Sequence, residues 1–240
     1  IRFGEFKANS FSELFNKTVR LPWKQFLKKD TSISIRTTCH KSKLYHNNAV
    51  TQRVHQAIEA NLSHPVSLIK NEEFGSSKKQ QLLIVRVFED IVTISIDSSG
   101  NPLHMRGYRE RVSKAPLREN LAAGLILAAG WDPQSPLIDP FCGSGTIPIE
   151  AMMIANNQAP GLFRDFAFKN WPGFKQNDWQ EIRKSQLSFV SSINPTIIGN
   201  DRDRGAVLMS EENAKKAKLN LLIQWENHSF SDIQPTGNPG

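Results

Sequence analysis

Hydrophobic and polar residues alternate in several short stretches of the first hundred residues. Residues 32–37 alternate with a period of two, which predicts a strand. Apolar residues within 50–62 recur at spacings of three and four, which predicts an amphipathic helix. Residues 81–88 and 91–97 are two apolar runs joined by a two-residue turn, which predicts a β-hairpin. We therefore expect an α+β module in residues 1–100.

Predicted helices and apolar strands alternate in the second half of the chain. In order, they are helix 116–127, strand 137–139, helix 146–155, strand 196–201, helix 204–219 and a third apolar run at 220–225. This order is typical of the Rossmann-like α/β class. The polar, Arg-rich residues 101–114 are expected to link the two halves.

An aromatic insert, residues 156–190, interrupts that alternation. Its aromatic residues are Phe163, Phe166, Phe168, Trp171, Phe174 and Trp179. They either pack the insert onto the domain that carries it, or form a lid or a nucleic-acid contact that stacks on bases.

Composition restricts the class of protein. The content of 39% hydrophobic and 22% charged residues is typical of a water-soluble globular chain. No apolar run reaches the ~20 residues of a membrane span. Two cysteines, Cys39 and Cys142, give no disulfide framework and suit a reducing compartment. We expect a cytoplasmic protein with no membrane partner and no metal.

Positive charge is concentrated in the first half. Residues 1–114 hold 19 Lys and Arg against 10 Asp and Glu, whereas residues 115–240 hold 11 against 13. A basic module beside a near-neutral one favours polyanion binding by the first, although a merely solvated surface would give the same counts. For RNA, the candidate contacts are Lys41, Lys43 and Arg53, because they surround the start of the long predicted helix, whose N-terminus favours phosphate.

The turn after strand 137–139 carries the most specific motif. Its sequence is Asp-Pro-Phe-Cys-Gly-Ser-Gly-Thr, from Asp139 to Thr146, and a helix follows at once. Gly143 and Gly145 allow positive φ and lack Cβ atoms where a ligand must approach the backbone. Ligands of open α/β sheets bind at such junctions. A generic glycine-rich turn is the alternative, whereas the NAD fingerprint and the P-loop are excluded by their missing residues.

Acidic residues stand at or after the ends of three apolar runs: Asp139, Asp201 and Asp232. Each alone could be a turn or N-cap residue. Together, at one edge of a Rossmann-like sheet, they can accept hydrogen bonds from a nucleoside. In this order, Asp201 would accept from ribose hydroxyls and Asp232 from the adenine amino group.

The eight-residue motif resembles motif I of S-adenosylmethionine-dependent methyltransferases, in the form used by amino-methylating enzymes. Nearly the whole chain is similar to the THUMP-domain RNA methyltransferases, especially the bacterial enzymes that methylate guanine N2 in 23S ribosomal RNA. The segments that carry this resemblance are motif I and residues 103–109, 115–123, 159–162 and 199–201. It implies a ferredoxin-like end at 1–30, a THUMP-like RNA-binding module at 31–100, and an incomplete Rossmann-like domain at 115–240 that binds S-adenosylmethionine.

The resemblance assigns a cofactor site residue by residue. The residues that it places on the cofactor loop are Asp139, Phe141, Gly143, Gly145 and Thr146. It places Asp201 at the ribose and Asp232 at the adenine. Arg118 and Glu119 match the helix that closes over the amino-acid end of the cofactor.

The chain departs from this family at both ends. The family's catalytic motif, Asn-Pro-Pro-aromatic, follows a fourth strand, whereas residues 238–240 read Asn-Pro-Gly. We therefore expect a fragment with no catalytic residue of its own, inactive alone, whose motif lies beyond Gly240. We also expect no opening strand at the N-terminus.

Three functions stay open on these residues. The first is a truncated RNA guanine-N2 methyltransferase with S-adenosylmethionine as cofactor and 23S rRNA as partner. The second is an adenine-N6 methyltransferase acting on DNA or RNA, because the motif I form is shared. The third is a non-catalytic RNA-binding protein with a vestigial cofactor site.

Overall fold

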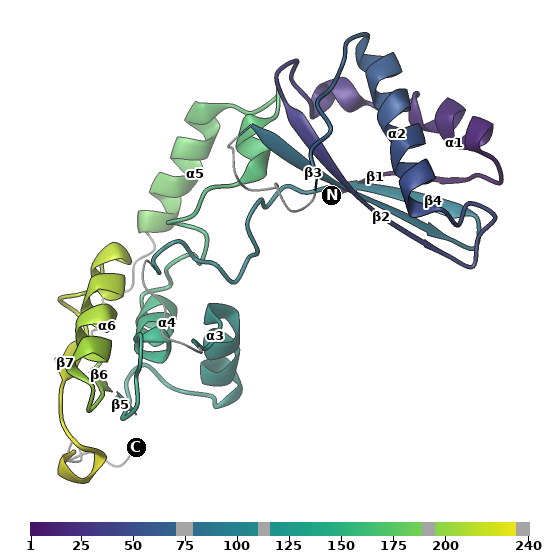
Figure 1. The fold of residues 1–240 in the computed structure, drawn as a ribbon. Coiled ribbons are helices and arrows are strands. Elements are labelled where there is room, and N and C mark those ends of the chain that lie inside the picture. Colours follow the sequence, from purple (N-terminus) through teal and green to yellow (C-terminus); the bar gives the residue numbers. More distant parts are fainter. Residues whose placement is uncertain (71–78, 110–115, 189–194, 234–240) are drawn as a thin grey trace. The chain divides into compact units, whose positions relative to one another are not determined.

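Two compact units make up the chain in the computed structural model, which describes residues 1–70, 79–109, 116–188 and 195–233 (Figure 1). Unit 1 consists of Ile1–Asn101 and Asp165–Lys175. Unit 2 consists of Pro102–Arg164 and Gln176–Gly240. Each unit has its own buried core.

Unit 1 is a four-stranded sheet with two helices on one face (Figure 1). Its elements are β1 (Arg2–Lys7), α1 (Phe11–Thr18), β2 (Ser32–His40), α2 (Asn47–Leu62), β3 (Gln80–Phe88) and β4 (Ile91–Ile96). The strand order is β1-β4-β3-β2, with β2 parallel to β3 and the other pairs antiparallel. The predicted strands, hairpin and long helix of this half are therefore confirmed.

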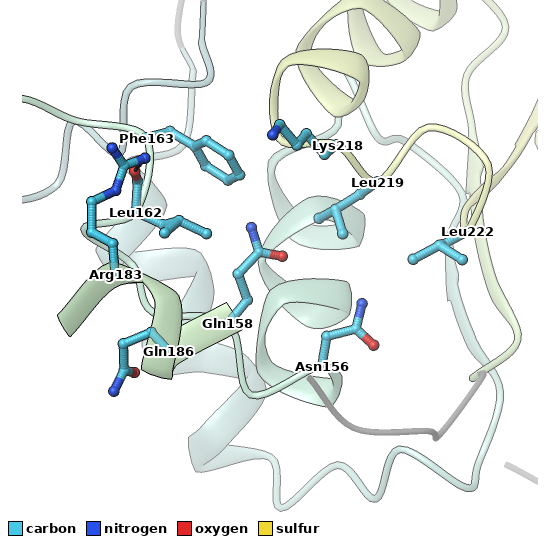
Figure 2. Close-up of a pocket in the computed structure, with 9 residues that line it drawn as sticks. All are labelled: Asn156, Gln158, Leu162, Phe163, Arg183, Gln186, Lys218, Leu219 and Leu222. Carbon is cyan, nitrogen blue, oxygen red and sulfur yellow. Dashed lines mark hydrogen bonds between the residues drawn. The ribbon is translucent and has the colours of Figure 1, made fainter. Parts of the chain in front are cut away.

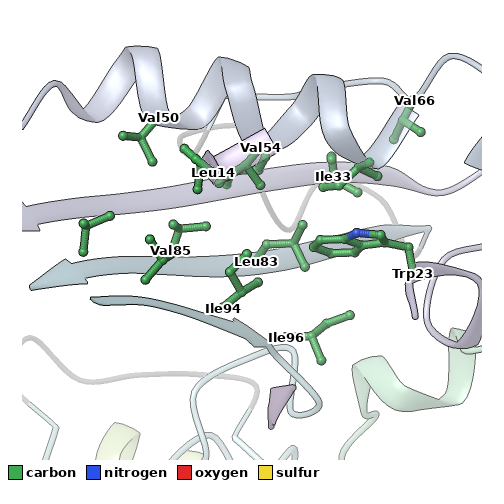
Figure 3. Packing of buried hydrophobic residues seen from close by; sticks show 14 of the residues in the cluster. Leu14, Trp23, Ile33, Val50, Val54, Val66, Leu83, Val85, Ile94 and Ile96 are labelled. Atoms are coloured by element: carbon green, nitrogen blue, oxygen red, sulfur yellow. The ribbon is translucent and has the colours of Figure 1, made fainter. Parts of the chain in front are cut away.

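The core of unit 1 lies between the sheet and its helices because alternate residues of each strand point to the same side. Figure 3 shows Leu83, Val85 and Ile94 beneath Val50 and Val54 of α2. All five side chains are fully buried, so their apolar surface is removed from water. This packing explains the helical spacing of apolar residues in α2.

Two expectations about unit 1 are wrong. An opening strand does exist, since β1 pairs with β4 in the same sheet as the rest of the module. Residues 1–30 therefore do not form a separate ferredoxin-like segment. The aromatic insert also divides between the units, because Asp165–Lys175 belongs to unit 1.

The unit 1 part of the aromatic insert has a packing role. The Trp171 ring centroid lies 4.9 Å from that of Phe26, and its Nε1 donates to Gln81 Oε1 at 2.8 Å. Phe168 lies 5.9 Å from Phe174 and its backbone N–H donates to the Ser98 carbonyl. Aromatic pairs at such distances stabilise a fold beyond the apolar area that they bury. The packing interpretation of the insert is supported, but against the N-terminal module rather than the domain that follows.

Unit 2 is a three-stranded parallel sheet with the order β5-β6-β7. Its elements are α3 (Glu119–Ala128), β5 (Leu137–Asp139), α4 (Thr146–Ala155), α5 (Gln176–Ser188), β6 (Ile197–Asn200), α6 (Arg204–Lys216), β7 (Gln224–Glu226) and a 3₁₀ turn at Phe230–Asp232. The predicted order of elements is confirmed. The third strand is shorter than expected and starts only at Gln224, since Leu221 is 91% exposed and Leu222 is also exposed.

Residues 102–109, part of the expected linker, belong to unit 2 and contribute to its core. Tyr108 is fully buried in its core and donates from its hydroxyl to Glu150 Oε1 at 3.1 Å. Arg106 pairs with the same carboxylate, with Nη2 3.4 Å from Oε2. Residues 102–109 are therefore not a linker, and residues 110–115 lie outside the described part of the chain.

Within the described residues, no helix has both the length and the apolar character that crossing a membrane requires. The same residues include no cluster of three or more His, Cys, Asp or Glu side chains that could hold a metal ion.

Candidate cofactor site

The loop between β5 and α4 turns through two residues of positive φ, Gly143 at 56° and Gly145 at 77°. The Cys142 N–H donates to the Asn200 carbonyl at 2.8 Å, which ties the loop to the end of β6. Because β5 and β6 are parallel, both strand ends lie at the same edge of the sheet. The motif predicted from sequence thus forms the expected strand–turn–helix junction.

Asp201 connects this loop to the end of β6. Its Oδ2 accepts from the Gly143 N–H at 3.0 Å, and its Oδ1 accepts from the Asp203 N–H at 2.9 Å. A carboxylate has about four acceptor sites, so both oxygens can still accept from a ligand hydroxyl. The structure therefore brings Asp201 and the loop together, as predicted.

Asp139 lies in the same region. Its Oδ1 accepts from the Phe141 N–H at 3.1 Å. Burial raises the pKa of Asp139, and the negative charge of Asp201 raises it further. Two carboxylates thus face one region, where donor groups of a ligand would relieve their mutual repulsion.

Sequence reasoning missed the bracing role of Asn200. Its side chain is fully buried, with Nδ2 donating to the carbonyls of Pro140 and His228, both at 3.2 Å. Its Oδ1 accepts from the His228 N–H at 2.9 Å. The Asn200 amide therefore joins the end of β6 to the segments that follow β5 and β7. The residue was visible within the Gly-Asn-Asp sequence, but a buried amide has no sequence signal of its own.

Helix α6 supports the loop from one side. Ser210 Oγ lies 2.9 Å from the Gly143 carbonyl oxygen, and Asn213 Nδ2 donates to the Ser144 carbonyl at 3.1 Å. A Cβ built on Gly145 would lie 2.8 Å from the Trp225 ring and 2.9 Å from Ser210 Cβ. Close packing therefore requires glycine at 145.

Arg109 contacts both Thr146 and Glu119. The Arg109 Nη2 donates to Thr146 Oγ1 at 2.7 Å and to the Leu117 carbonyl at 2.8 Å. Its Nε lies 3.4 Å from Glu119 Oε1, and both side chains are largely buried. Arg118, the N-cap residue of α3, is exposed. Of the predicted pair, Glu119 is therefore a buried acid and Arg118 an exposed cation. Glu119 is held by Arg109, to which the sequence analysis gave no role.

Two exposed aromatic rings lie at the same edge. The Phe141 ring stacks on that of Phe230, with centroids 5.3 Å apart and planes at 19°. Both side chains are more than half exposed. Asp232, two residues further on, is exposed in the 3₁₀ turn and its Oδ1 lies 3.4 Å from Ser231 Oγ. Sequence reasoning missed Phe230, although an aromatic two residues before Asp232 was visible.

These residues fit an adenosine-containing ligand such as S-adenosylmethionine. A Cβ built on Gly143 meets no atom within 4 Å, so the loop leaves open space there. Asp201 and Asp139 supply acceptors for hydroxyl groups, and Phe141 presents an exposed ring face. The open backbone at Gly143 would take the methionine part of such a ligand.

A pocket of about 230 Å³ lies elsewhere in unit 2 (Figure 2). Its lining includes Asn156 after α4, Leu162 of the insert, Arg183 of α5 and Lys218 after α6. Because α4 begins at the glycine loop and Asn156 follows its last residue, this pocket is at the opposite end of the helix from the candidate site. None of the predicted cofactor residues lines it.

The three predicted RNA contacts lie in unit 1, in different surroundings. Lys41 and Lys43 are exposed in the loop after β2, and the Lys43 N–H donates to Asp90 Oδ1 at 2.8 Å. Arg53 lies in α2 and is half-buried, with its guanidinium carbon 5.9 Å from the centroid of the Phe15 ring. The two lysines remain candidates, whereas Arg53 already has an intramolecular partner.

Cys142 allows a test of the buried loop by pH. Burial raises the pKa of its thiol from an ordinary value of 9.0 to about 12. The folded state therefore favours the neutral thiol, and its contribution is complete below pH 9 and lost as the pH rises to 12. Relative to Cys142→Ala, the free energy of unfolding should fall by about 1.4 kcal/mol per pH unit in that window. Urea titrations across the window measure it, and parallel pH profiles would contradict a buried thiol.

The fold and site define a methyltransferase-type α/β domain that follows a smaller α+β module along the chain. The family model described as "RMKL-like, methyltransferase domain" matches residues 106–239, and the THUMP domain model matches residues 8–97. The chain therefore belongs to the RMKL-like methyltransferase family and carries a THUMP domain. The predicted resemblance and fold class are confirmed.

Curated relatives cover almost the whole chain. YpsC of Bacillus subtilis, provisionally named an RNA methyltransferase, is 35% identical over 97% of this chain and 60% of its own length. Ribosomal RNA large subunit methyltransferase K/L of a Marinomonas species is 34% identical over 98% of this chain and 33% of its own length. The chain thus spans about 60% of the length of the first of these relatives.

Solved structures also resemble nearly the whole chain. A protein from Listeria monocytogenes, described as an N6-adenine-specific DNA methylase, has a TM-score of 0.84 and 35% identity, and covers 98% of this chain and 62% of its own. SMU.472, provisionally named a methyltransferase and solved in complex with SAH, has a TM-score of 0.80 and 30% identity, and covers 100% of this chain and 63% of its own.

Proposed function

We propose that the chain forms the RNA-binding and cofactor-binding part of an S-adenosylmethionine-dependent RNA methyltransferase that acts on large-subunit ribosomal RNA in the cytoplasm. The observation that carries this proposal is the glycine loop braced by the Asp201 carboxylate, in a chain that also holds a THUMP domain. The names of the ribosomal RNA methyltransferase K/L relatives and the SAH bound to SMU.472 support it.

The acceptor atom in this proposal is the exocyclic N2 of guanine in 23S rRNA. S-adenosylmethionine supplies an activated methyl group, so the protein's task is to hold donor and acceptor in line. The basic charge of residues 1–114 favours a polyanionic substrate. A second candidate is an adenine-N6 methyltransferase, which is favoured by the description of the Listeria protein.

We propose that these 240 residues do not themselves supply the group that orients the methyl acceptor. The sequence holds no Asn-Pro-Pro-aromatic motif, and residues 234–240 lie outside the described part. We expect the 240-residue chain to bind cofactor and RNA without turnover in a tritium-transfer assay on undermodified ribosomal RNA. Robust turnover would contradict the assignment, and transfer to guanine or adenine by a longer chain would decide between the two candidates.

Calorimetry with SAH tests the cofactor site directly. Asp201→Ala should weaken SAH binding by at least tenfold, because it removes two acceptors for ribose hydroxyls and each such bond contributes about 1 kcal/mol or more. Asp203→Ala is the matched control, since its exposed carboxylate instead caps α6 through the Gly205 N–H. Equal SAH affinity of wild type and Asp201→Ala would refute the ribose assignment.

A further inference from the structure

Helices α1 and α2 lie on one face of the unit 1 sheet (Figure 1). The other, outer face carries a row of exposed aromatic and apolar side chains. His40 of β2 lies beside Phe88 of β3, and Phe88 lies opposite Ile91 of β4. The His40 and Phe88 rings stack, with centroids 6.0 Å apart and planes at 14°. Phe88 is 49% exposed and Ile91 is 46% exposed. Two stacked aromatic rings and an apolar neighbour are thus partly exposed to solvent.

Three cations lie on the same face of the sheet as this row. Arg86 precedes Phe88 by two residues on β3, and Arg36 lies on the outer face of β2, so both point to this side. Lys7 of β1 is the register partner of Ile91. All three are exposed. The acid on this face of β1, Glu5, is paired with Arg2 at 2.7 Å, so its charge is offset.

We propose that this outer sheet face binds unpaired bases of RNA, an inference that rests on the proposed function as an RNA methyltransferase. Bases stack on exposed rings at about 1–3 kcal/mol per base, and a four-stranded sheet with aromatic side chains is an established platform for single strands. His40 and Phe88 supply the rings. Arg36 and Arg86 supply phosphate contacts beside them.

The composition of the face distinguishes this occupant from others. An interface between protein chains would be depleted of charge at its centre, whereas here Arg86 lies two residues from Phe88 on the same face of β3. A duplex hides its base faces and would use the cations only. The face therefore fits a single strand, whose bases and phosphates are both accessible. It differs from the contacts expected from sequence, because Lys41 and Lys43 lie at its end, after His40, and Arg53 lies on α2.

The test uses the full chain and fluorescence anisotropy with a labelled single-stranded oligouridine. We expect Phe88→Ala to weaken binding roughly tenfold, and Phe88→Tyr to retain it. Arg36→Ala with Arg86→Ala should lower the slope of log affinity against log salt by roughly 0.7 per arginine. Arg20→Ala with Lys24→Ala is the matched control, because it removes two exposed cations that lie away from this face.

The outcomes separate the inference from the function beneath it. If the wild-type chain binds neither oligouridine nor ribosomal RNA at low salt, the proposed RNA function fails. If it binds and the Phe88 and arginine variants bind equally well, the outer face is not the site. Loss in Lys41→Ala with Lys43→Ala alone would move the site to the loop after β2. Dissociation of a dimer by Phe88→Ala, measured by sedimentation, would make the face a contact between two copies and overturn the inference.

Discussion

Replacing Gly145 by alanine is expected to destabilise unit 2 by roughly 2–5 kcal/mol and to abolish SAH binding. Its φ of 77° is unfavourable for residues with a Cβ, at about 1–2 kcal/mol. The added Cβ would also lie within 3.0 Å of Trp225 and Ser210, and such overpacking costs about 1–3 kcal/mol. Urea unfolding and calorimetry with SAH measure the two effects.

Gly143→Ala is the matched comparison, and it should separate folding from binding. Its φ is 56°, but its Cβ meets no atom within 4 Å. We therefore expect only the smaller conformational cost of about 1–2 kcal/mol in stability. SAH affinity should still fall, because the methyl group would occupy the space left for the ligand. Unchanged SAH binding by Gly143→Ala would mean that the ligand does not approach this part of the loop.

The glycine loop was predictable from sequence because its chemistry is local. The strand, the acid, the glycines and the helix are contiguous from Leu137 to Ala155, and each has a recognisable residue type. The hairpin of unit 1 was predictable for the same reason, since β3 and β4 are adjacent in the chain. By contrast, β1 is recognised only through its pairing with β4, more than 80 residues away.

Buried contacts between residues far apart in the chain could not be predicted from the sequence. Arg106 and Arg109 suggested an exposed linker because arginine is usually at the surface. Their partners, Glu150 and Thr146, lie 44 and 37 residues away, so the pairing has no local signal. Trp171 is similar, because its partner Gln81 is 90 residues distant and in the other half of the chain. Asp232 was predicted as an acid after an apolar run, but its exposed position in a 3₁₀ turn follows from no local pattern.

Removing Glu150 should destabilise unit 2 by about 3–5 kcal/mol, because it leaves a largely buried arginine without its counter-charge. The Arg106 side chain is 13% exposed and that of Glu150 is 2% exposed. Burial raises the pKa of Glu150 although Arg106 opposes this, so desolvation of the carboxylate is not fully offset by the ion pair. Glu211→Ala, on the exposed side of α6, is the matched control and should change stability by less than about 0.5 kcal/mol.

The same site tests whether residues 102–109 hold unit 2 together or merely lie against it. Tyr108→Phe should cost only about 1 kcal/mol, the value of one hydrogen bond, since the ring stays buried. Arg106→Met combined with Glu150→Leu removes both charges, and should recover most of the stability that Glu150→Ala loses. If Glu150→Ala unfolds at the same urea concentration as Glu211→Ala, the segment contributes nothing to unit 2 and functions as the linker that its sequence suggested.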